Sequence, residues 1–148
     1  MPKIDLDAIT AGNKTGYPSP YDKLVEGRWV RRLAPHFGLS DFGASHVTLK
    51  PGAGSSQRHW HEDEDELVVM LAGEAVLIDD NGRTPLKPGD VAVFPKNDGN
   101  GHHIVNESDA DCVFVAIGRP PVGDCHYPDI DMAFSGETGF TRKDGSAF

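Results

Sequence analysis

Hydrophobic residues occur along this chain in short runs, separated by turns rich in glycine, proline, asparagine and aspartate. Residues 67–71, 91–94 and 112–117 are such runs, and β-branched and aromatic side chains are frequent in them. Runs of this length and composition are typical of β-strands. No helical spacing of apolar residues persists for more than a turn or two. The pattern therefore predicts an all-β protein, either an antiparallel sandwich or a small barrel.

The same pattern predicts three parts within one domain. Residues 1–27 are polar and interrupted by glycine and proline, which predicts an irregular N-terminal arm. Residues 28–118 carry the strand pattern and predict the β-barrel. Residues 119–148 are again rich in glycine and proline, and we expect a C-terminal tail that packs on the barrel through apolar anchors. A length of 148 residues suits one domain with its own core.

Charge and composition argue against several classes of partner. The formal net charge of −9 disfavours a nucleic-acid surface, which needs a basic stripe, and also an anionic membrane. No apolar stretch approaches the roughly 20 residues that span a bilayer. The first residues lack the apolar block of a secretory signal, so we expect a cytoplasmic protein. Cys112 and Cys125 make no disulfide framework, and two reduced thiols are expected.

Residues 57–73 carry the candidate chemistry. His59 and His61 are two positions apart, so in a strand they share one face. An acidic turn follows, and Glu66 opens the returning strand beside the pair. Imidazole nitrogens and a carboxylate oxygen are ligands for zinc, Fe(II), Mn(II) or Ni(II). A third histidine would leave two positions of an octahedral ion open for water, oxygen or a bidentate substrate.

A second strand, which begins at His102 or His103, can supply this third histidine. Adjacent strand residues face opposite sides, so only one of the two can join the site. The alternative without a metal remains open at this point, because a His-x-His pair alone often binds nothing. An acidic run is also usually a solvated loop. The joint pattern favours a metal site.

The first stretch resembles the first motif of the cupin superfamily, G-x5-H-x-H-x3,4-E-x6-G. His59, His61, Glu66 and Gly73 match its spacing, and only the leading glycine is displaced by one residue. The resemblance covers residues 40–118. It implies a double-stranded β-helix, the jelly-roll-like cupin barrel, with one divalent metal ion inside.

A second stretch resembles the second cupin motif, G-x5-P-x-G-x2-H-x3-N. Gly89, Pro95, His102 and Asn106 correspond to it, with a longer loop between the proline and the histidine. The spacing to Asn106 favours His102 over His103. The resemblance therefore implies a ligand set of three imidazoles and one carboxylate: His59, His61, Glu66 and His102.

Four further residues are candidates for contact with a small-molecule ligand. Gln57 shares strand parity with His59 and is expected at the rim of the site. Phe94 and Met70 are candidates for an apolar lining, although they can equally be ordinary core residues. His46 either lines the barrel or lies on a partly exposed strand face.

The resemblance implies a small-molecule metalloenzyme with oxygenase-type or isomerase-type chemistry. The alternative is a non-catalytic cupin that binds a sugar-like ligand, with a metal that is structural or grips that ligand. A homodimer is expected, as in many small barrels of this family. The net charge of −9 and the few basic residues near the motifs disfavour a phosphorylated substrate, and Lys96 and Arg58 are the only nearby candidates to hold a phosphate. His126 and Tyr127 lie in the tail, and we expect them not to reach the site.

Overall fold

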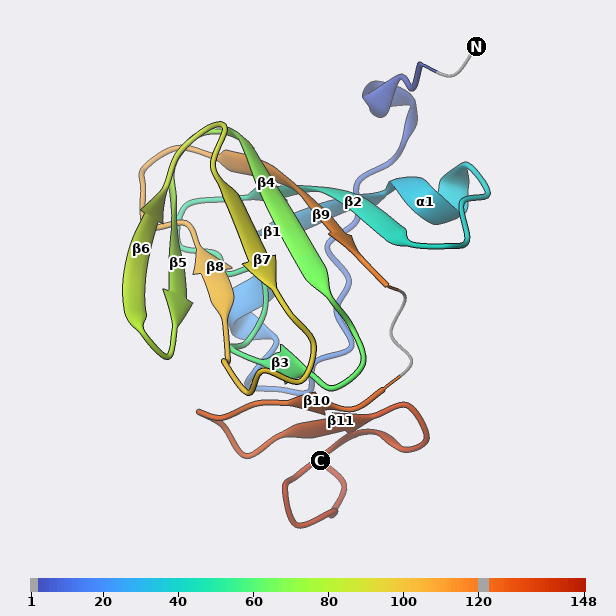
Figure 1. Ribbon diagram of the computed structural model, residues 1–148, viewed down its shortest axis with the longest axis vertical. Helices are drawn as coiled ribbons and strands as arrows, with labels where there is room; N and C mark the ends of the chain where they lie inside the picture. Colours follow the sequence, from blue (N-terminus) through green and yellow to red (C-terminus); the bar gives the residue numbers. More distant parts are fainter. Residues whose placement is uncertain (1–2, 120–122) are drawn as a thin grey trace.

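The computed structural model describes residues 3–119 and 123–148, and most of its regular structure is β-strand (Figure 1). The strands are β1 (Arg28–Arg32), β2 (Gly43–Leu49), β3 (Trp60–His61), β4 (Glu66–Ala72), β5 (Ala75–Asp79), β6 (Gly82–Leu86), β7 (Val91–Phe94), β8 (His103–Val105), β9 (Cys112–Gly118), β10 (Cys125–His126), β11 (Ala133–Ser135) and β12 (Gly139–Thr141). The short helical segments are η1 (Leu6–Ala8), η2 (Lys23–Val25) and α1 (Leu33–His36). Among the described residues, no helix is both long and apolar enough to cross a membrane.

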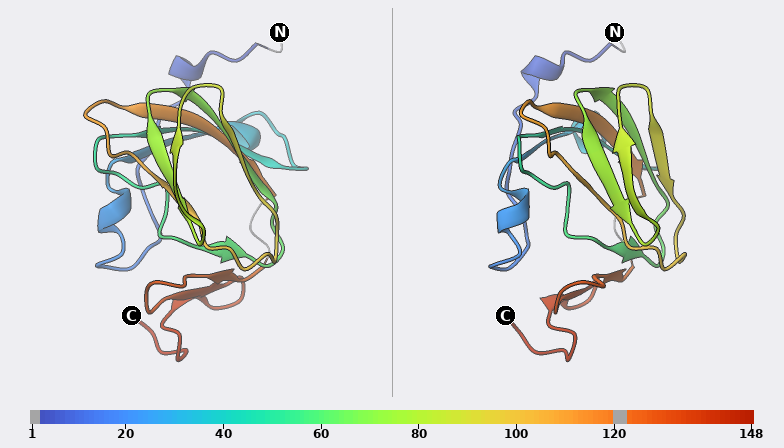
Figure 2. Two further views of the ribbon diagram at one scale, coloured as in Figure 1. Left: turned by 60° about the vertical axis from the view of Figure 1, so that its left-hand side comes forward. Right: turned by 90° about the vertical axis from the view of Figure 1, so that its left-hand side faces the viewer.

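The strands form three antiparallel sheets within the described part of the chain. The first has the order β1-β2-β9-β4-β7, the second β6-β5-β8, and the third β12-β11-β10-β3. Figure 2 shows the first two sheets facing each other across a common interior, while the third lies at one end. This arrangement confirms the expected all-β architecture.

The interior between the first two sheets is the main hydrophobic core. Val68 and Met70 of β4 alternate with outward residues and are 7% and 2% exposed, as the period of two requires. Phe114 of β9, in the same sheet, and Ile104 of β8, in the facing sheet, belong to the same core cluster. Burial of each such side chain stabilises the fold by roughly 1.5–3 kcal/mol. The core therefore fixes which face of each strand points inward, and with it the direction of Glu66 on β4.

Asn106 is a fully buried polar residue that holds the chain after β8. Its Nδ2 atom donates hydrogen bonds to the carbonyl oxygens of Leu49, at 2.9 Å, and Ala110, at 2.7 Å. Its Oδ1 atom accepts from the backbone N–H of Ser108 at 3.0 Å. A buried amide is tolerated only with such partners. Asn106 therefore joins the end of β2 to the turn that leads into β9.

Gly73 ends β4 in a conformation that only glycine adopts without strain. Its φ angle is +71°, in the left-handed region. A Cβ atom there would clash with the carbonyl oxygen of Asp111 and lie 2.8 Å from the Cα atom of Cys112. The glycine therefore allows the turn after β4 to pack directly on the start of β9.

The tail is more regular than its sequence pattern indicated, because β12, β11 and β10 pair in that order and β10 also pairs with β3. Tyr127 and Met132 of the tail are buried in a second hydrophobic cluster. Tyr17 and Tyr21 of the N-terminal arm pack against this cluster. The arm and the tail therefore meet each other at the end of the barrel where β3 lies (Figure 1).

A second contact anchors the tail. The guanidinium of Arg58 donates two hydrogen bonds to the carboxylate of Asp129, at 2.6 and 2.7 Å. It also pairs with Asp80 and donates to the carbonyl oxygen of Gly101 at 3.1 Å. Because Arg58 lies directly before His59, this network fixes the tail beside the candidate site.

Candidate metal centre

The candidate ligands come from three neighbouring segments of the barrel. His59 and His102 lie directly opposite each other in an antiparallel bridge, with backbone N–O distances of 3.1 and 2.8 Å. Residues opposite each other in such a pair share one face. His61 ends β3 on the same face as His59, and Glu66 opens β4 after the acidic turn.

The three imidazole rings converge on one carboxylate oxygen of Glu66. The Oε2 atom of Glu66 lies 3.1 Å from Nε2 of His102, 3.5 Å from Nε2 of His61 and 4.0 Å from Nε2 of His59. The two Nε2 atoms of His59 and His61 are 2.9 Å apart. The structure therefore brings together the four residues that the sequence predicted as ligands.

His102 rather than His103 joins this cluster. His102 is 4% exposed, and its ring stacks on that of Phe94 with centroids 3.7 Å apart. The Nδ1 atom of His103 donates instead to the carbonyl oxygen of Ser56 at 3.0 Å. The alternation of the strand thus separates the two adjacent imidazoles.

The tautomers of two histidines are suited to metal binding. Nδ1 of His59 donates to the carbonyl oxygen of Gln57 at 2.9 Å, and Nδ1 of His102 donates to that of Asn100 at 3.1 Å. A carbonyl oxygen only accepts, so in each neutral ring the proton is on Nδ1 and the lone pair on Nε2 faces the cluster.

This arrangement requires a positive charge at the centre. The Nε2 lone pair of a neutral His102 and the carboxylate oxygen of Glu66 are both acceptors, and they face each other at 3.1 Å. Such a pair is unfavourable unless a proton or a metal ion lies between the two atoms. Three imidazoles and one carboxylate are a donor set that suits zinc, Fe(II), Mn(II) or Ni(II). The residues present therefore fit a divalent metal ion.

Burial and mutual contact shift the pKa values in opposite directions. Burial lowers the pKa of His59 to about 4, so this ring is neutral at pH 7. Burial also lowers the pKa of His61, but contacts with Cys125 and Glu66 outweigh it and raise the value to about 10. Burial raises the pKa of Glu66, yet the contacts with His102 and His61 hold it well below its usual range. Glu66 is therefore a carboxylate ready to bind a cation.

A pocket of about 540 Å³ borders the cluster at Glu66. The apolar part of its wall comes from Phe42, Phe94 and Ile117, and its positive charge comes from Lys96 and Arg119. Aspartates also line it: Asp41, Asp63 and Asp65. The pocket has room for a small organic molecule that reaches Glu66.

The four residues proposed for ligand contact occupy different places. Phe94 lines the pocket. Met70 lies in the main core, further along β4 than Glu66. The Nε2 atom of Gln57 donates to the carbonyl oxygen of Tyr21, so the side chain of Gln57 holds the N-terminal arm. His46 alternates with the buried Val47 on β2, so it faces away from the core.

The basic residues differ from those expected. The guanidinium of Arg58 is already engaged by Asp129 and Asp80, so it is not available to hold a phosphate in the pocket. Lys96 does line the pocket, as does Arg119, which lies outside both motifs and was not a candidate from the sequence. Arg119 follows directly after β9, and only the pairing of β9 with β4 brings it there.

The expectation that Tyr127 does not reach the site is wrong, whereas His126 stacks on Trp60 on the other face of β3. The ring of Tyr127 lies 5.8 Å from that of His59, centroid to centroid. Cys125 pairs directly opposite His61. The physical reason is the pairing of β10 with β3, which the glycine- and proline-rich pattern of the tail did not predict. The one sequence signal for this strand pairing is the alternation of Cys125 and Tyr127 with the polar His126.

Comparison with known proteins agrees with the fold and the motifs. The cupin domain family model matches residues 45–118. The chain is similar to the crystal structure of a sugar phosphate isomerase of the cupin superfamily from Silicibacter pomeroyi DSS-3. The two share 43% sequence identity and superpose with a TM-score of 0.92, over 99% of this chain and 96% of that chain. A cupin 2 conserved barrel domain protein from Salinispora arenicola CNS-205 has 27% identity and a TM-score of 0.56, over 72% and 91% of the two chains.

A curated relative adds a second similarity. An oxalate-binding protein from Thermotoga maritima is 37% identical over 71 residues, which are 48% of this chain and 56% of that protein. The match thus spans little more than half of the relative's length. Because the cupin domain model matches half of the chain and the Silicibacter protein is 43% identical over nearly its whole length, the chain belongs to the cupin family.

Proposed function

We propose that this protein is a metal-dependent isomerase of small, negatively charged hydroxy-carbonyl compounds, with a sugar phosphate as the substrate class. The observation that carries the proposal is the convergence of three imidazoles and Glu66 beside a pocket that also contains Lys96 and Arg119. The 43% identity to a sugar phosphate isomerase supports the same class.

The residues of the pocket suit the parts of such a substrate. When bound, a divalent ion supplies Lewis-acid polarisation of the carbonyl group. Lys96 and Arg119 are the cationic side chains of the pocket wall, and they attract the phosphate end. Isomerisation moves a proton between adjacent carbons and needs no external oxidant. The carboxylate of Asp63 in the same wall has the chemistry of the base that takes up this proton.

The test is a turnover assay in deuterated water. Protein loaded separately with zinc, manganese, nickel or iron is incubated with a panel of aldose and ketose phosphates, and with the same sugars lacking phosphate. Proton-transfer isomerisation predicts solvent deuterium in the product, which NMR detects. A Lys96→Ala variant is expected to raise KM for phosphorylated substrates only. Lys87→Ala, an exposed lysine outside this pocket, is the matched control.

Two outcomes contradict the proposal. Oxygen consumption by the iron-loaded protein with a small organic substrate, without isomerisation, assigns the site to oxygenase chemistry. Equal activity of the His59→Ala variant and the unchanged protein shows that the imidazole cluster is not the active site.

A second candidate function is the binding of a small anion without turnover. The 37% identity to an oxalate-binding protein is the observation that favours it. Calorimetric titration of the metal-loaded protein with oxalate and with sugar phosphates separates the two functions. Tight binding of a compound that stays chemically unchanged favours the binding protein, whereas binding followed by conversion favours the isomerase. The expected homodimer and the cytoplasmic location stay predictions.

A further inference from the structure

A cysteine of the tail lies beside two of the proposed ligands. In the antiparallel pair of β3 and β10, Cys125 is directly opposite His61, and His126 is directly opposite Trp60. Opposite residues share a face and have Cβ atoms roughly 4.5–5.5 Å apart. The rings of Trp60 and His126 stack on the other face, with centroids 4.2 Å apart and an angle of 18° between them. This stack fixes the register that directs Cys125 toward the histidines.

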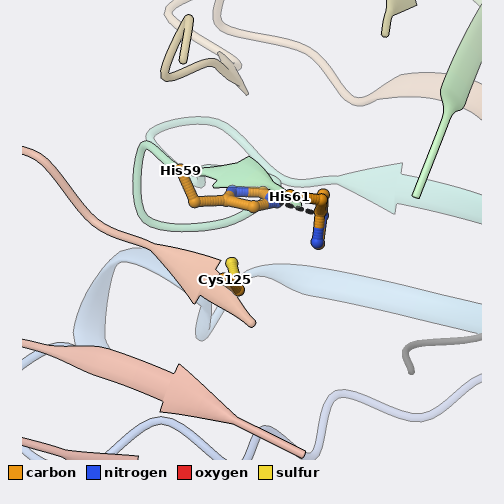
Figure 3. Close-up of side chains that lie close together, drawn as sticks. All are labelled: His59, His61 and Cys125. Atoms are coloured by element: carbon orange, nitrogen blue, oxygen red, sulfur yellow. Dashed lines mark hydrogen bonds between the residues drawn. The ribbon is translucent and has the colours of Figure 1, made fainter. Parts of the chain in front are cut away.

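The sulfur is within reach of an ion bound by His59 and His61. The ligand atoms of His59, His61 and Cys125 all lie within 4.8 Å of one another. Figure 3 shows the sulfur of Cys125 directed toward the two imidazole rings. Zinc bonds of about 2.1 Å to nitrogen and 2.3 Å to sulfur separate two ligand atoms by roughly 3.5 Å in a tetrahedral site. Small side-chain movements therefore suffice for all three atoms to bind one ion.

The surroundings of the thiol keep it in this position. Cys125 is 5% exposed and packs with Tyr127 and Met132 in the second hydrophobic cluster. It is a free cysteine, as is Cys112, which lies in the main core. Cys125 is thus a buried soft donor, held by the tail and adjacent to two imidazoles.

We propose that the sulfur of Cys125 is a further ligand of the metal ion that His59 and His61 bind. The proposal rests on the metal centre proposed above and adds to it a donor from outside the barrel motifs. His59 belongs to both groups of donors, the one with Cys125 and the one with Glu66 and His102. Thiolate favours zinc and cobalt over manganese and magnesium, so Cys125 selects the softer metals. Through it the ion also ties the tail to the barrel.

Cobalt spectroscopy tests the proposal without relying on activity. The unchanged protein, titrated with Co(II), is expected to develop a thiolate-to-cobalt charge-transfer band in the near ultraviolet. Cys125→Ser is expected to lose this band and to bind zinc at least about tenfold more weakly. Cys112→Ser, the matched control at the other free cysteine, is expected to retain both properties. Near-ultraviolet circular dichroism checks that each variant is folded.

The outcomes separate the two proposals. Stoichiometric cobalt with visible ligand-field bands but no charge-transfer band overturns the role of Cys125 and leaves the imidazole and carboxylate site intact. No cobalt binding at all overturns both. If Cys125→Ser fails to fold, the spectrum of the unchanged protein still decides.

Discussion

His59 and His102 come from distant parts of the chain and form one antiparallel bridge, and each uses the same device to orient its ring. In both, Nδ1 donates to the carbonyl oxygen two residues earlier, Gln57 for one and Asn100 for the other. Both Nε2 atoms then face the carboxylate of Glu66, at 4.0 and 3.1 Å. The backbone thus sets the tautomers before any ion binds, which reduces the ordering that metal binding requires.

The first prediction concerns the ligand set. His59→Ala or His61→Ala is expected to abolish stoichiometric metal in the purified protein while the barrel stays folded, because each removes a donor at the centre of the cluster. Metal content is measured by plasma mass spectrometry and folding by circular dichroism. Unchanged metal content in either variant contradicts the site.

The second prediction separates two adjacent histidines. His102→Ala is expected to lose metal, because its Nε2 atom lies 3.1 Å from Glu66. His103→Ala is expected to keep it, because the His103 ring is directed to the carbonyl oxygen of Ser56. Metal content is measured in both variants as before. Loss of metal in His103→Ala but not in His102→Ala would place His103 in the centre.

The third prediction concerns Gly73. Gly73→Ala is expected to lower the free energy of unfolding by about 3 kcal/mol or more, since backbone strain adds to a clash with backbone atoms. Gly52→Ala is the control: its φ angle is also positive, +82°, but a Cβ atom meets nothing within 4 Å. There a cost of about 1 kcal/mol is expected from strain alone. Equal costs in urea unfolding would show that the contact with Asp111 does not matter.

The fourth prediction concerns Asn106. Asn106→Ala removes the donor to the buried carbonyl oxygen of Leu49 and one of the two donors to the carbonyl oxygen of Ala110. The expected loss of stability is about 3 kcal/mol, because each unpaired group costs roughly 1–3 kcal/mol. Asn81→Ala, in the exposed turn between β5 and β6, is expected to cost about 0.5 kcal/mol or less. Thermal unfolding of both variants makes the comparison.

The fifth prediction concerns acid stability. The hydrogen bonds from Arg58 hold the pKa of Asp129 below its usual range. The resulting stabilisation is fully present above the unfolded pKa of about 3.9 and is lost as pH falls through the folded value. It is at most about 1 kcal/mol, because the carboxylate is half exposed and screened by solvent.

Unfolding of Asp129→Asn and the unchanged protein tests this from neutral pH down to about pH 3. The stability difference between them is expected to shrink on acidification. Asp109→Asn, at an exposed carboxylate before β9, is the control. A difference that is constant with pH contradicts the proposed role of the ion pair.

Much of the fold could be predicted because its signals are local. Alternation along β4 placed Glu66, Val68 and Met70 on one face, since side chains in any strand alternate with a period of two. Gly73 marked the end of β4, because a turn with positive φ needs glycine there. The spacing of His59, His61 and Glu66 predicted a shared site for the same local reason.

The remaining features depended on which segments pair. Parity alone could not choose between His102 and His103, because the choice depends on the register of that segment against His59. The contact of Cys125 with His61 depends on the pairing of β10 with β3. The sequence by itself determined the strands of the barrel, the inward face of β4 and the proposed ligands of the barrel motifs. Only the tertiary structure decided how the tail reaches them, because strand pairing between distant segments is set by the packing of the whole core and not by local preference.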